Sequence, residues 1–268
     1  MQCGPEAIRY AARVHLQAAD DVWARIDALA RAEPGGVVAT DGDGTLWSGD
    51  VGEDMFMAFL EHGRVEVAAL DALRREARHH SLSDAGGGPD IARRIYAAYH
   101  AGQFPEERVC ELMVWCFAGW PRGEARAFAR DVVDRGGLAG RLQGEVLRVL
   151  ERARAAGLEV ILVSASPIDV VLEAGQRVGF DEAHVVAARP RYEAEVMLAE
   201  VERPIPYATG KVSRLRERIG ERVLYAAFGD NEFDVSMLAT ARVPVAVRPK
   251  PRLRRRAADL PGVVELTP

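Results

Sequence analysis

The sequence has little of what stabilises or anchors a protein in an oxidising or membrane environment. Its cysteines are only three, an odd number, and no two form a C-x-x-C pair, so neither a disulfide framework nor a zinc site is expected. No uninterrupted apolar run is long enough to span a membrane, and charged residues among the apolar ones make the N-terminus a poor signal peptide. We therefore expect a cytoplasmic protein with no role at a membrane.

An excess of positive charge is also missing, since the net charge is -5. Non-specific nucleic-acid binding depends on neutralising phosphates with Lys and Arg, so nucleic acid is not an expected partner. The basic run from Arg248 to Arg256 is interpreted as a solvated helix face, with a patch for phosphate or an acidic partner as the alternative. A length of 268 residues, 49 % of them hydrophobic, suits one large or two small globular domains. No oligomeric state is predicted.

Apolar periodicity divides the chain into a helical part and a part in which strands and helices alternate. Residues 5–31 are predicted to form one helix. From Val51 to about Gly140 no strand pattern is present, and helices are predicted at 53–62, 65–80, 90–101, 105–118 and 123–134. Later helices are predicted at 142–156, 167–178, 209–219 and 232–239. Strands are predicted at 37–39, 158–163, 183–188, 223–228 and 243–247, and residues 192–197 and 199–203 can pair as a hairpin.

Alternating strands and helices predict a parallel sheet with right-handed crossovers. Because strand 37–39 belongs to the same sheet, the helices that follow it are an insertion. The predicted fold class is α/β, a Rossmann-like parallel-sheet core with helices on both faces and an all-helical cap inserted after the first strand. The corresponding parts are 1–48, the N-terminal helix and start of the core, 49–140, the cap, and 141–268, the remainder of the core.

The first predicted strand runs into an acidic turn, Asp-Gly-Asp-Gly-Thr, which begins at Asp41. Alternate side chains of an extended segment share a face, so Asp41 and Asp43 point toward one spot beyond the strand, where open α/β sheets bind ligands. Two such carboxylates repel each other unless a cation, a proton or an electrophile separates them. A plain Asp-Gly turn is the alternative. A calcium loop is excluded, because Leu46 and Gly52 stand where it needs glycine and a bidentate glutamate.

Two later strands also end in polar clusters. Strand 158–163 precedes Ser164, and strand 223–228 precedes Asp230 and Asp234; parallel strands end at one edge, so these groups converge on the acidic turn. Aspartates are hard oxygen donors that suit Mg²⁺, and Ser164 with a helix N-terminus offers an anion site. Lys211 adds a cation just inside the helix that Thr209 can cap. This combination fits phosphoryl transfer to an acidic nucleophile.

In these motifs the chain resembles the haloacid dehalogenase-like hydrolase superfamily, on its phosphoserine-phosphatase-like branch. The resemblance covers the chain from about Val37 onward, and the helices between the first two motifs resemble the helical cap of that family. The matching motifs are Asp41-Gly-Asp43-Gly-Thr45-Leu, Ser164 in Val-Ser-Ala-Ser-Pro, Lys211 in Thr-Gly-Lys, and Asp230 and Asp234 in Gly-Asp-Asn-Glu-Phe-Asp.

The resemblance implies a role for each motif residue. Asp41 would be the nucleophile that forms an aspartyl-phosphate, and Asp43 would protonate the leaving group and then activate water. Dehalogenases of the family lack the second aspartate, so Asp43 favours phosphate esters. Asp234 would bind the metal through water or orient Lys211. The implied phosphate-binding residues are Ser164, Lys211, Gly44 and Thr45, and the implied Mg²⁺ ligands are Asp41, Asp43, Asp230 and Asp234.

Substrate selectivity is expected in the cap and in the loop after Asp43. Asp50 stands where phosphoserine phosphatases carry an acidic residue that meets the amino group of the substrate, which points toward an amine-bearing phosphomonoester. Asp50 and Glu53 can instead be solvated or cap the next helix. Phe233 replaces the asparagine usual on that branch, and with Trp47 it predicts a more apolar pocket.

Three arginines of the cap, Arg74, Arg75 and Arg78, are candidates to bind a substrate carboxylate, although a solvated helix face is the preferred interpretation. The expected function is therefore Mg²⁺-dependent hydrolysis of a small phosphorylated metabolite. The alternatives are a phosphotransferase and a catalytically silent member that binds a phosphorylated ligand or a partner.

Overall fold

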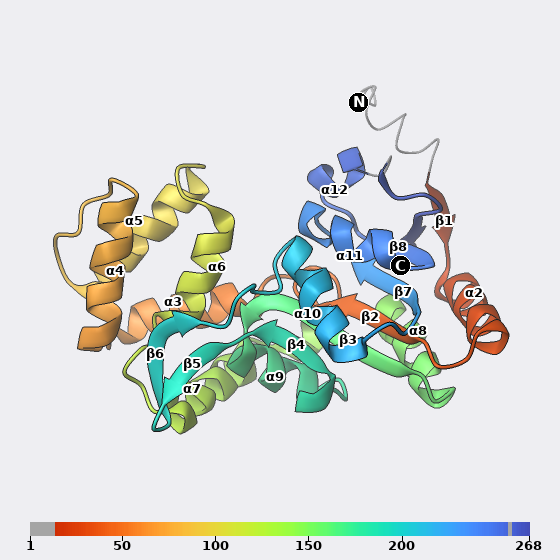
Figure 1. The fold of residues 1–268 in the computed structure, drawn as a ribbon, viewed down its shortest axis with the longest axis horizontal. Helices are drawn as coiled ribbons and strands as arrows, with labels where there is room; N and C mark the ends of the chain where they lie inside the picture. The colour runs from red at the N-terminus through yellow and green to blue at the C-terminus, as the bar shows by residue number, and fades with distance from the viewer. Residues whose placement is uncertain (1–13, 257–258) are drawn as a thin grey trace.

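The computed structural model describes residues 14–256 and 259–268, and at its centre is a seven-stranded sheet in which every pairing is parallel (Figure 1). The strand order is β1-β9-β8-β7-β2-β3-β4. The strands are β1 (His15–Gln17), β2 (Val37–Asp41), β3 (Glu159–Pro167), β4 (Val185–Ala188), β7 (Leu224–Gly229), β8 (Val243–Val247) and β9 (Val264–Leu266). The predicted α/β class is confirmed.

Alternate residues of the central strands build apolar cores on opposite faces of the sheet. Val38 and Leu162 belong to one core, and their neighbours Ala39 and Ile161 belong to the other. The first core is covered by α2 (Ala19–Ala32), α8 (Gly144–Ala155) and α9 (Ile168–Gln176). The second is covered by α10 (Thr209–Ile219), α11 (Val235–Thr240) and α12 (Pro251–Arg256). Helices therefore lie on both faces, as predicted.

Between β2 and β3 the chain forms the predicted helical insertion. Its helices are α3 (Val51–His62), α4 (Val67–His79), α5 (Gly88–His100), α6 (Glu106–Trp115) and α7 (Arg122–Arg135), followed by a 3₁₀ turn at Leu138–Arg141. Figure 1 shows α4, α5 and α6 standing away from the sheet, whereas α7 packs on α9 of the core. None of the described helices is long and apolar enough to cross a membrane.

A two-stranded hairpin, β5 (Pro190–Glu193) and β6 (Val196–Val201), packs against α6. The predicted hairpin exists, but its turn lies at Ala194 and Glu195 rather than near Leu198. Both turn residues have positive φ, 46° and 64°, a conformation that hairpin turns normally give to Gly, Asn or Asp. Because neither residue is of that kind, the sequence carries no signal for the true turn.

The helix predicted over residues 5–31 is confirmed from Ala19 onward but is wrong before that residue. His15–Gln17 is strand β1, which pairs with β9, and α2 begins only at Ala19. Leu16 fits the helical apolar stripe, yet its side chain is 69 % exposed. Backbone pairing at the sheet edge overrides the local periodicity here. Residues 1–13 lie outside the described part of the chain, and β9 had no predicted counterpart.

The Tyr225 side chain of β7 makes hydrogen bonds with the backbone of the segment that leads into β2. Its buried hydroxyl accepts a hydrogen bond from the Gly36 N–H at 2.8 Å and donates one to the Glu33 carbonyl. The ring lies so close to Gly36 that a Cβ there would be 2.4 Å from a ring carbon. The hydroxyl therefore satisfies two backbone groups that no other described residue serves.

Replacing Tyr225 by Phe leaves the Gly36 N–H buried without an acceptor. We expect the free energy of unfolding to fall by about 1–3 kcal/mol, measured by urea denaturation. Tyr192→Phe is the matched control, because the Tyr192 hydroxyl makes no hydrogen bond to a described residue, and its effect should stay within about 0.5 kcal/mol. Equal losses in the two variants would contradict this role of Tyr225.

Candidate active site

The sequence motifs meet at the carboxyl edge of the sheet. Asp41 is the last residue of β2, Ser164 lies near the end of β3, and Asp230 directly follows β7, while Lys211 stands in the first turn of α10. These residues and Asp234 line a cavity of about 380 Å³, which is closed on its other side by residues of α3, α5 and α6 from the cap. The topology thus brings all four motifs to one place beneath the cap.

A buried lysine bridges two of the aspartates. Lys211 Nζ donates to Asp41 Oδ1 at 2.6 Å and to Asp234 Oδ1 at 2.5 Å, and all three side chains are buried. Burial opposes the charge on Lys211, but the two carboxylates outweigh it and raise the pKa of this group. Burial and the neighbouring charge of Asp234 raise the pKa of Asp41, although Lys211 works in the opposite direction.

Asp41, Asp230 and Asp234 can bring one carboxylate oxygen each to within 4.8 Å of one another. Both oxygens of Asp234 already have donors, since Oδ1 contacts Lys211 and Oδ2 accepts from the Asp230 and Asn231 N–H groups at 3.0 Å. Asp41 Oδ2 and Asp230 Oδ1 have no donor among the described residues. Hard carboxylate oxygens of this kind fit a divalent cation such as Mg²⁺.

Asp43 is held by four donors. Its Oδ1 accepts from Trp47 Nε1 at 2.8 Å and from the Val51 N–H at 2.7 Å. Its Oδ2 accepts from the hydroxyls of Ser166 at 2.8 Å and Ser164 at 3.2 Å. The side chain is thereby fixed at the cavity wall, and Ser166, which the sequence did not single out, is one of the groups that fix it.

Comparison with known proteins covers the part of the chain that carries these motif residues. A family model described as haloacid dehalogenase-like hydrolase matches residues 38–239, most of the chain. The chain belongs to the haloacid dehalogenase-like hydrolases. No curated protein sequence matches it, so solved structures supply the remaining comparison.

Three solved structures have a fold similar to that of this hydrolase. A protein of unknown function from Bordetella pertussis Tohama I is 22 % identical, with a TM-score of 0.64 over 86 % of this chain and 97 % of its own. A HAD family hydrolase from Salmonella enterica serovar Typhi is 17 % identical, with a TM-score of 0.54 over 85 % and 66 %. A substrate-bound phosphoserine phosphatase is 16 % identical, with a TM-score of 0.52 over 87 % and 93 %. At these identities the likeness concerns the fold.

Two predicted residues of the hydrolase lie behind the cavity rather than in its wall. Trp47 is fully buried and supports Asp43, so it does not supply the apolar surface that the sequence predicted. Thr45 is also fully buried, and its Oγ1 has no hydrogen-bond partner among the described residues. Gly44 does line the cavity, with φ +82° and space so limited that a Cβ would lie 2.2 Å from Asp230 Oδ2.

The helix that carries Lys211 begins at Thr209 as predicted, but Thr209 does not cap it. Ala208 occupies the N-cap position, with φ 48° and no side-chain hydrogen bond. Gly210 follows because a Cβ there would lie 2.0 Å from the Ile205 carbonyl oxygen. Close backbone packing, rather than a capping hydroxyl, therefore sets where Lys211 enters the site. Ser164 likewise lies within β3, four residues before α9 begins, and not at a helix N-terminus.

The predicted selectivity residues Asp50, Glu53 and Phe233 do line the cavity. Asp50 caps α3 by accepting from the Glu53 N–H at 2.8 Å, so the capping alternative is confirmed for Asp50. Glu53 accepts from the Tyr96 hydroxyl at 2.8 Å. Phe233 lies against Tyr207, with ring centroids 4.5 Å apart.

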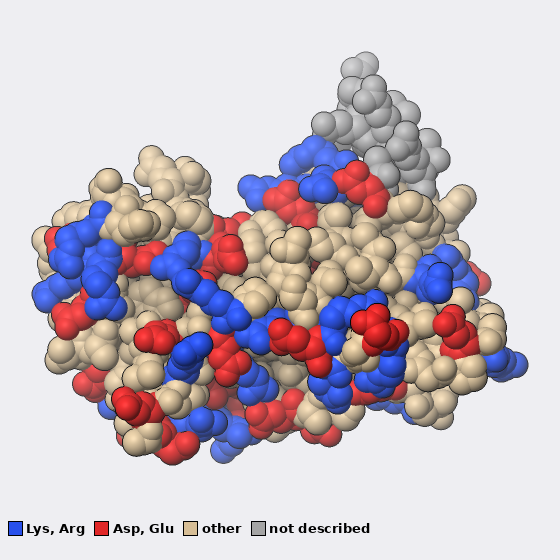
Figure 2. Space-filling view, viewed as in Figure 1, with Lys and Arg blue, Asp and Glu red and all other residues tan. Residues whose placement is uncertain are grey.

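Lys250 lines the active cavity, although the sequence analysis interpreted it as part of a solvated basic run. Its Nζ lies 2.9 Å from Asp230 Oδ2, and its N–H donates to the Asp230 carbonyl at 2.8 Å. Lys250 follows β8, the strand next to β7, so the rule that strand ends converge could have found it. Elsewhere in the run Arg248 pairs with Glu145 and Arg252 with Glu232. Figure 2 shows positive and negative side chains interspersed over the face of the molecule that it presents.

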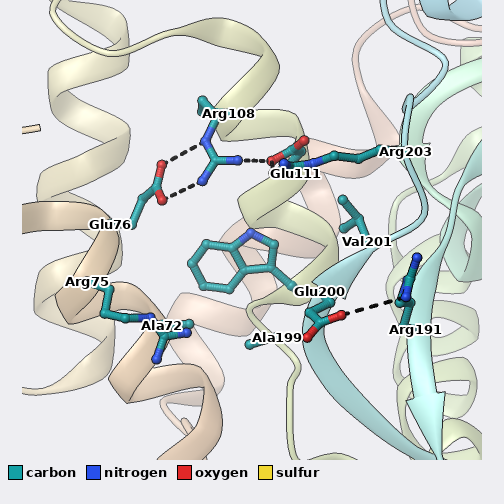
Figure 3. Close-up of a pocket in the computed structure, with 11 residues that line it drawn as sticks. Ala72, Arg75, Glu76, Arg108, Glu111, Arg191, Ala199, Glu200, Val201 and Arg203 are labelled. Carbon is teal, nitrogen blue, oxygen red and sulfur yellow. Dashed lines mark hydrogen bonds and ion pairs between the residues drawn. The ribbon is translucent and has the colours of Figure 1, made fainter. Parts of the chain in front are cut away.

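The cap arginines considered as carboxylate ligands do not line the active cavity. Arg78 pairs with Asp84 at 2.7 Å, and Arg75 lines a second cavity of about 460 Å³ between the cap and the hairpin (Figure 3). Arg74 lines neither cavity. Helix α6 separates the two, because Glu106, Val109, Cys110 and Met113 line the active cavity, whereas Arg108, Glu111 and Trp115 line the second.

The buried carboxylates predict how divalent cations and pH act together on stability. Burial raises the pKa of Asp41, and it raises that of Asp230 to about 6. A carboxyl group whose pKa is higher in the folded protein than in the unfolded chain stabilises the fold at pH values below its unfolded pKa. This contribution is lost as the pH rises through the folded-state pKa. We therefore expect the melting temperature in EDTA to fall as pH increases from about 5 to about 8.

Mg²⁺ must displace these protons to bind, so the rise in melting temperature on adding Mg²⁺ should be larger at about pH 8 than at about pH 5. Asp230→Asn should remove most of that rise, whereas Asp131→Asn, an exposed position on α7, should retain it. A Mg²⁺-induced shift that is the same at both pH values would argue against a metal at these carboxylates.

Proposed function

We propose that this haloacid dehalogenase-like hydrolase is a Mg²⁺-dependent phosphatase that hydrolyses a small-molecule phosphomonoester through an aspartyl-phosphate on Asp41. One observation carries the proposal. Asp41 is buried at the carboxyl edge of the sheet, and Lys211 contacts its Oδ1. Its Oδ2 has no donor among the described residues, and its carboxylate lies near that of Asp230. The similarity in fold to a substrate-bound phosphoserine phosphatase supports a small phosphorylated substrate. The finer form of the proposal is an amine-bearing compound, for which the sequence suggested a phosphoserine-like example.

The charge of the cavity explains why a metal is part of the proposal. Seven carboxylates but only two lysines, Lys211 and Lys250, line it. A phosphate ester would be repelled by this surface. Asp41 Oδ2 and Asp230 Oδ1 are the oxygens available to hold Mg²⁺, with the Asp43 carbonyl as a further ligand implied by the family. Mg²⁺, when bound, offsets charge on the phosphoryl oxygens.

In the first step an Asp41 carboxylate oxygen attacks phosphorus, and the bond from phosphorus to the ester oxygen breaks. Asp43 gives its proton to the departing alkoxide. In the second step Asp43 takes a proton from water as the water oxygen attacks phosphorus, and the bond to Asp41 breaks. Inorganic phosphate leaves, Asp41 is again a carboxylate, and Asp43 is again protonated.

The contacts of Asp43 suit a group that changes protonation state. Its Oδ1 contacts two N–H groups, which can only donate. Its Oδ2 contacts the hydroxyls of Ser164 and Ser166, which can donate to a carboxylate or accept from a carboxylic acid. The mobile proton of Asp43 is therefore expected at Oδ2, and Ser166 acts as a positioning residue.

Loss of the nucleophile provides the main test. Asp41→Asn should lower the rate of phosphate release from an aryl phosphate by about 10⁴-fold or more, and omission of Mg²⁺ should abolish release by the unaltered protein. Asp131→Asn is the control and should keep full activity. Equal rates for the Asp41→Asn variant and the unaltered protein would disprove the mechanism. Product analysis with added alcohols separates hydrolysis from phosphotransfer.

Ser166→Ala removes one hydroxyl from Asp43 Oδ2. We expect kcat to fall about 10-fold, with a displaced pH–rate profile, while Ser166→Thr restores both. Ser48→Ala, an exposed serine on the loop after Asp43, is the control. A fall in kcat without any displacement of the pH–rate profile would assign Ser166 a purely structural role.

A further inference from the structure

The part of the active cavity that faces the cap carries carboxyl groups and aromatic rings but no guanidinium group. Lys211 lies at the opposite end on Asp41, and Lys250 contacts Asp230 there, although its charge also acts on Glu106. The carboxylates of the cap side are Asp50, Glu53 and Glu106, and its rings are Tyr99, Tyr207 and Phe233. The reacting end and the cap end of the cavity therefore suit ligand groups of different charge.

Two of the cap-side carboxylates have no cationic partner among the described residues. Asp50 accepts from backbone N–H, and Glu53 accepts from the Tyr96 hydroxyl. Their neighbour Asp54, which does not line the cavity, has an ion pair with Arg141 at 2.5 Å. Carboxylates shielded from water are stabilised by an opposite charge. Asp50 and Glu53 thus offer a place for a cation that a ligand brings.

The cap arginines Arg75 and Arg108 line the second cavity, on the far side of α6. Figure 3 shows Arg108 between Glu76 and Glu111, with Arg203 also on Glu111 and Arg75 at the edge of the second cavity. Glu106, at the rim of the active cavity, has its nearest guanidinium, that of Arg252, 4.0 Å away, and Arg252 does not line the cavity. No guanidinium group of the described residues therefore lines the active cavity to bind a substrate carboxylate.

We propose that the substrate is the phosphate monoester of a cationic amino alcohol that carries no carboxylate, with Asp50 and Glu53 binding its ammonium group. This inference rests on the proposed phosphatase activity and names its substrate class. Tyr99, Tyr207 and Phe233 add ring faces or edges of the kind that attract an ammonium group. A carboxylate on the same carbon skeleton would be repelled by Asp50 and Glu53, and no guanidinium group of the described residues lines the cavity to offset the repulsion.

The test measures kcat/KM for phosphate release by the full chain with Mg²⁺ on four probes. O-phosphoethanolamine and phosphocholine carry a primary and a quaternary ammonium group. Ethyl phosphate lacks the ammonium group, and O-phosphoserine adds a carboxylate to phosphoethanolamine. We expect at least one ammonium probe to exceed both ethyl phosphate and phosphoserine by about 10-fold to 100-fold, the value of a hydrogen-bonded charge pair.

Substitutions at the start of α3 test whether Asp50 and Glu53 cause the preference for ammonium probes. Glu53→Gln and Asp50→Asn should each lower the ratio of kcat/KM for the better ammonium probe to that for ethyl phosphate by about 10-fold. Asn retains the ability to cap a helix, so Asp50→Asn keeps the start of α3 intact. Glu61→Gln, an exposed position on the same helix, is the matched control and should leave the ratio unchanged.

The outcomes separate this inference from the proposed function. If kcat/KM for phosphoserine or ethyl phosphate equals that for both ammonium probes, the proposed substrate class is wrong. An unchanged ratio in both α3 variants would also contradict it. Neither result would contradict the proposed phosphatase activity. If neither the four probes nor an aryl phosphate releases phosphate, the proposed function itself falls.

Discussion

The contact of Lys211 with Asp41 and Asp234 is the interaction on which the site depends. Three charged groups are removed from water, at a cost of several kcal/mol for each ion, and the cost is offset because β2, α10 and the turn after β7 each deliver one partner at hydrogen-bond distance. Gly229 permits the approach, since a Cβ there would lie 2.5 Å from Asp234 Cβ. The ends of the central strands are thereby locked in the arrangement that the proposed chemistry requires.

Charge is distributed unevenly along the active cavity, and this gradient links the proposed chemistry to the proposed substrate. At the sheet edge Lys211 and Lys250 partly offset the aspartates, and the divalent cation of the proposed function would complete the neutralisation. At the cap end Asp50 and Glu53 have no lysine or arginine partner within the described part of the chain. A ligand that is negative at one end and positive at the other matches both ends, and its orientation follows from the charges alone.

The parts of the structure that could be predicted are those in which one local rule decides the outcome. Asp41, Ser164 and Asp230 were predicted to converge because residues at the ends of parallel strands must do so. Strand β1 was missed because its pairing with β9 comes from a part of the chain about 250 residues away. Trp47 was misplaced because an indole after an acidic turn can pack inward as easily as toward a ligand.

The family could therefore be predicted from the motifs of the sequence, whereas the residues that line the cap side of the cavity could not. Lys250 was assigned to a solvated basic face because charge density along a chain does not say which single member turns inward. The helices of the cap were predicted as elements, but their relative placement depends on side-chain packing that periodicity leaves open. Which arginines face the cavity is a property of that packing, and this decides the charge the substrate meets.

Helix α6 has a consequence for how the protein tolerates change. One face of the helix lines the active cavity, the opposite face lines the second cavity, and every residue from Val109 to Trp115 except Cys110 is buried. An ordinary surface helix keeps a solvated side on which substitutions cost little. Over these two turns α6 has no such side, so a change in bulk on either face displaces a wall that both cavities share.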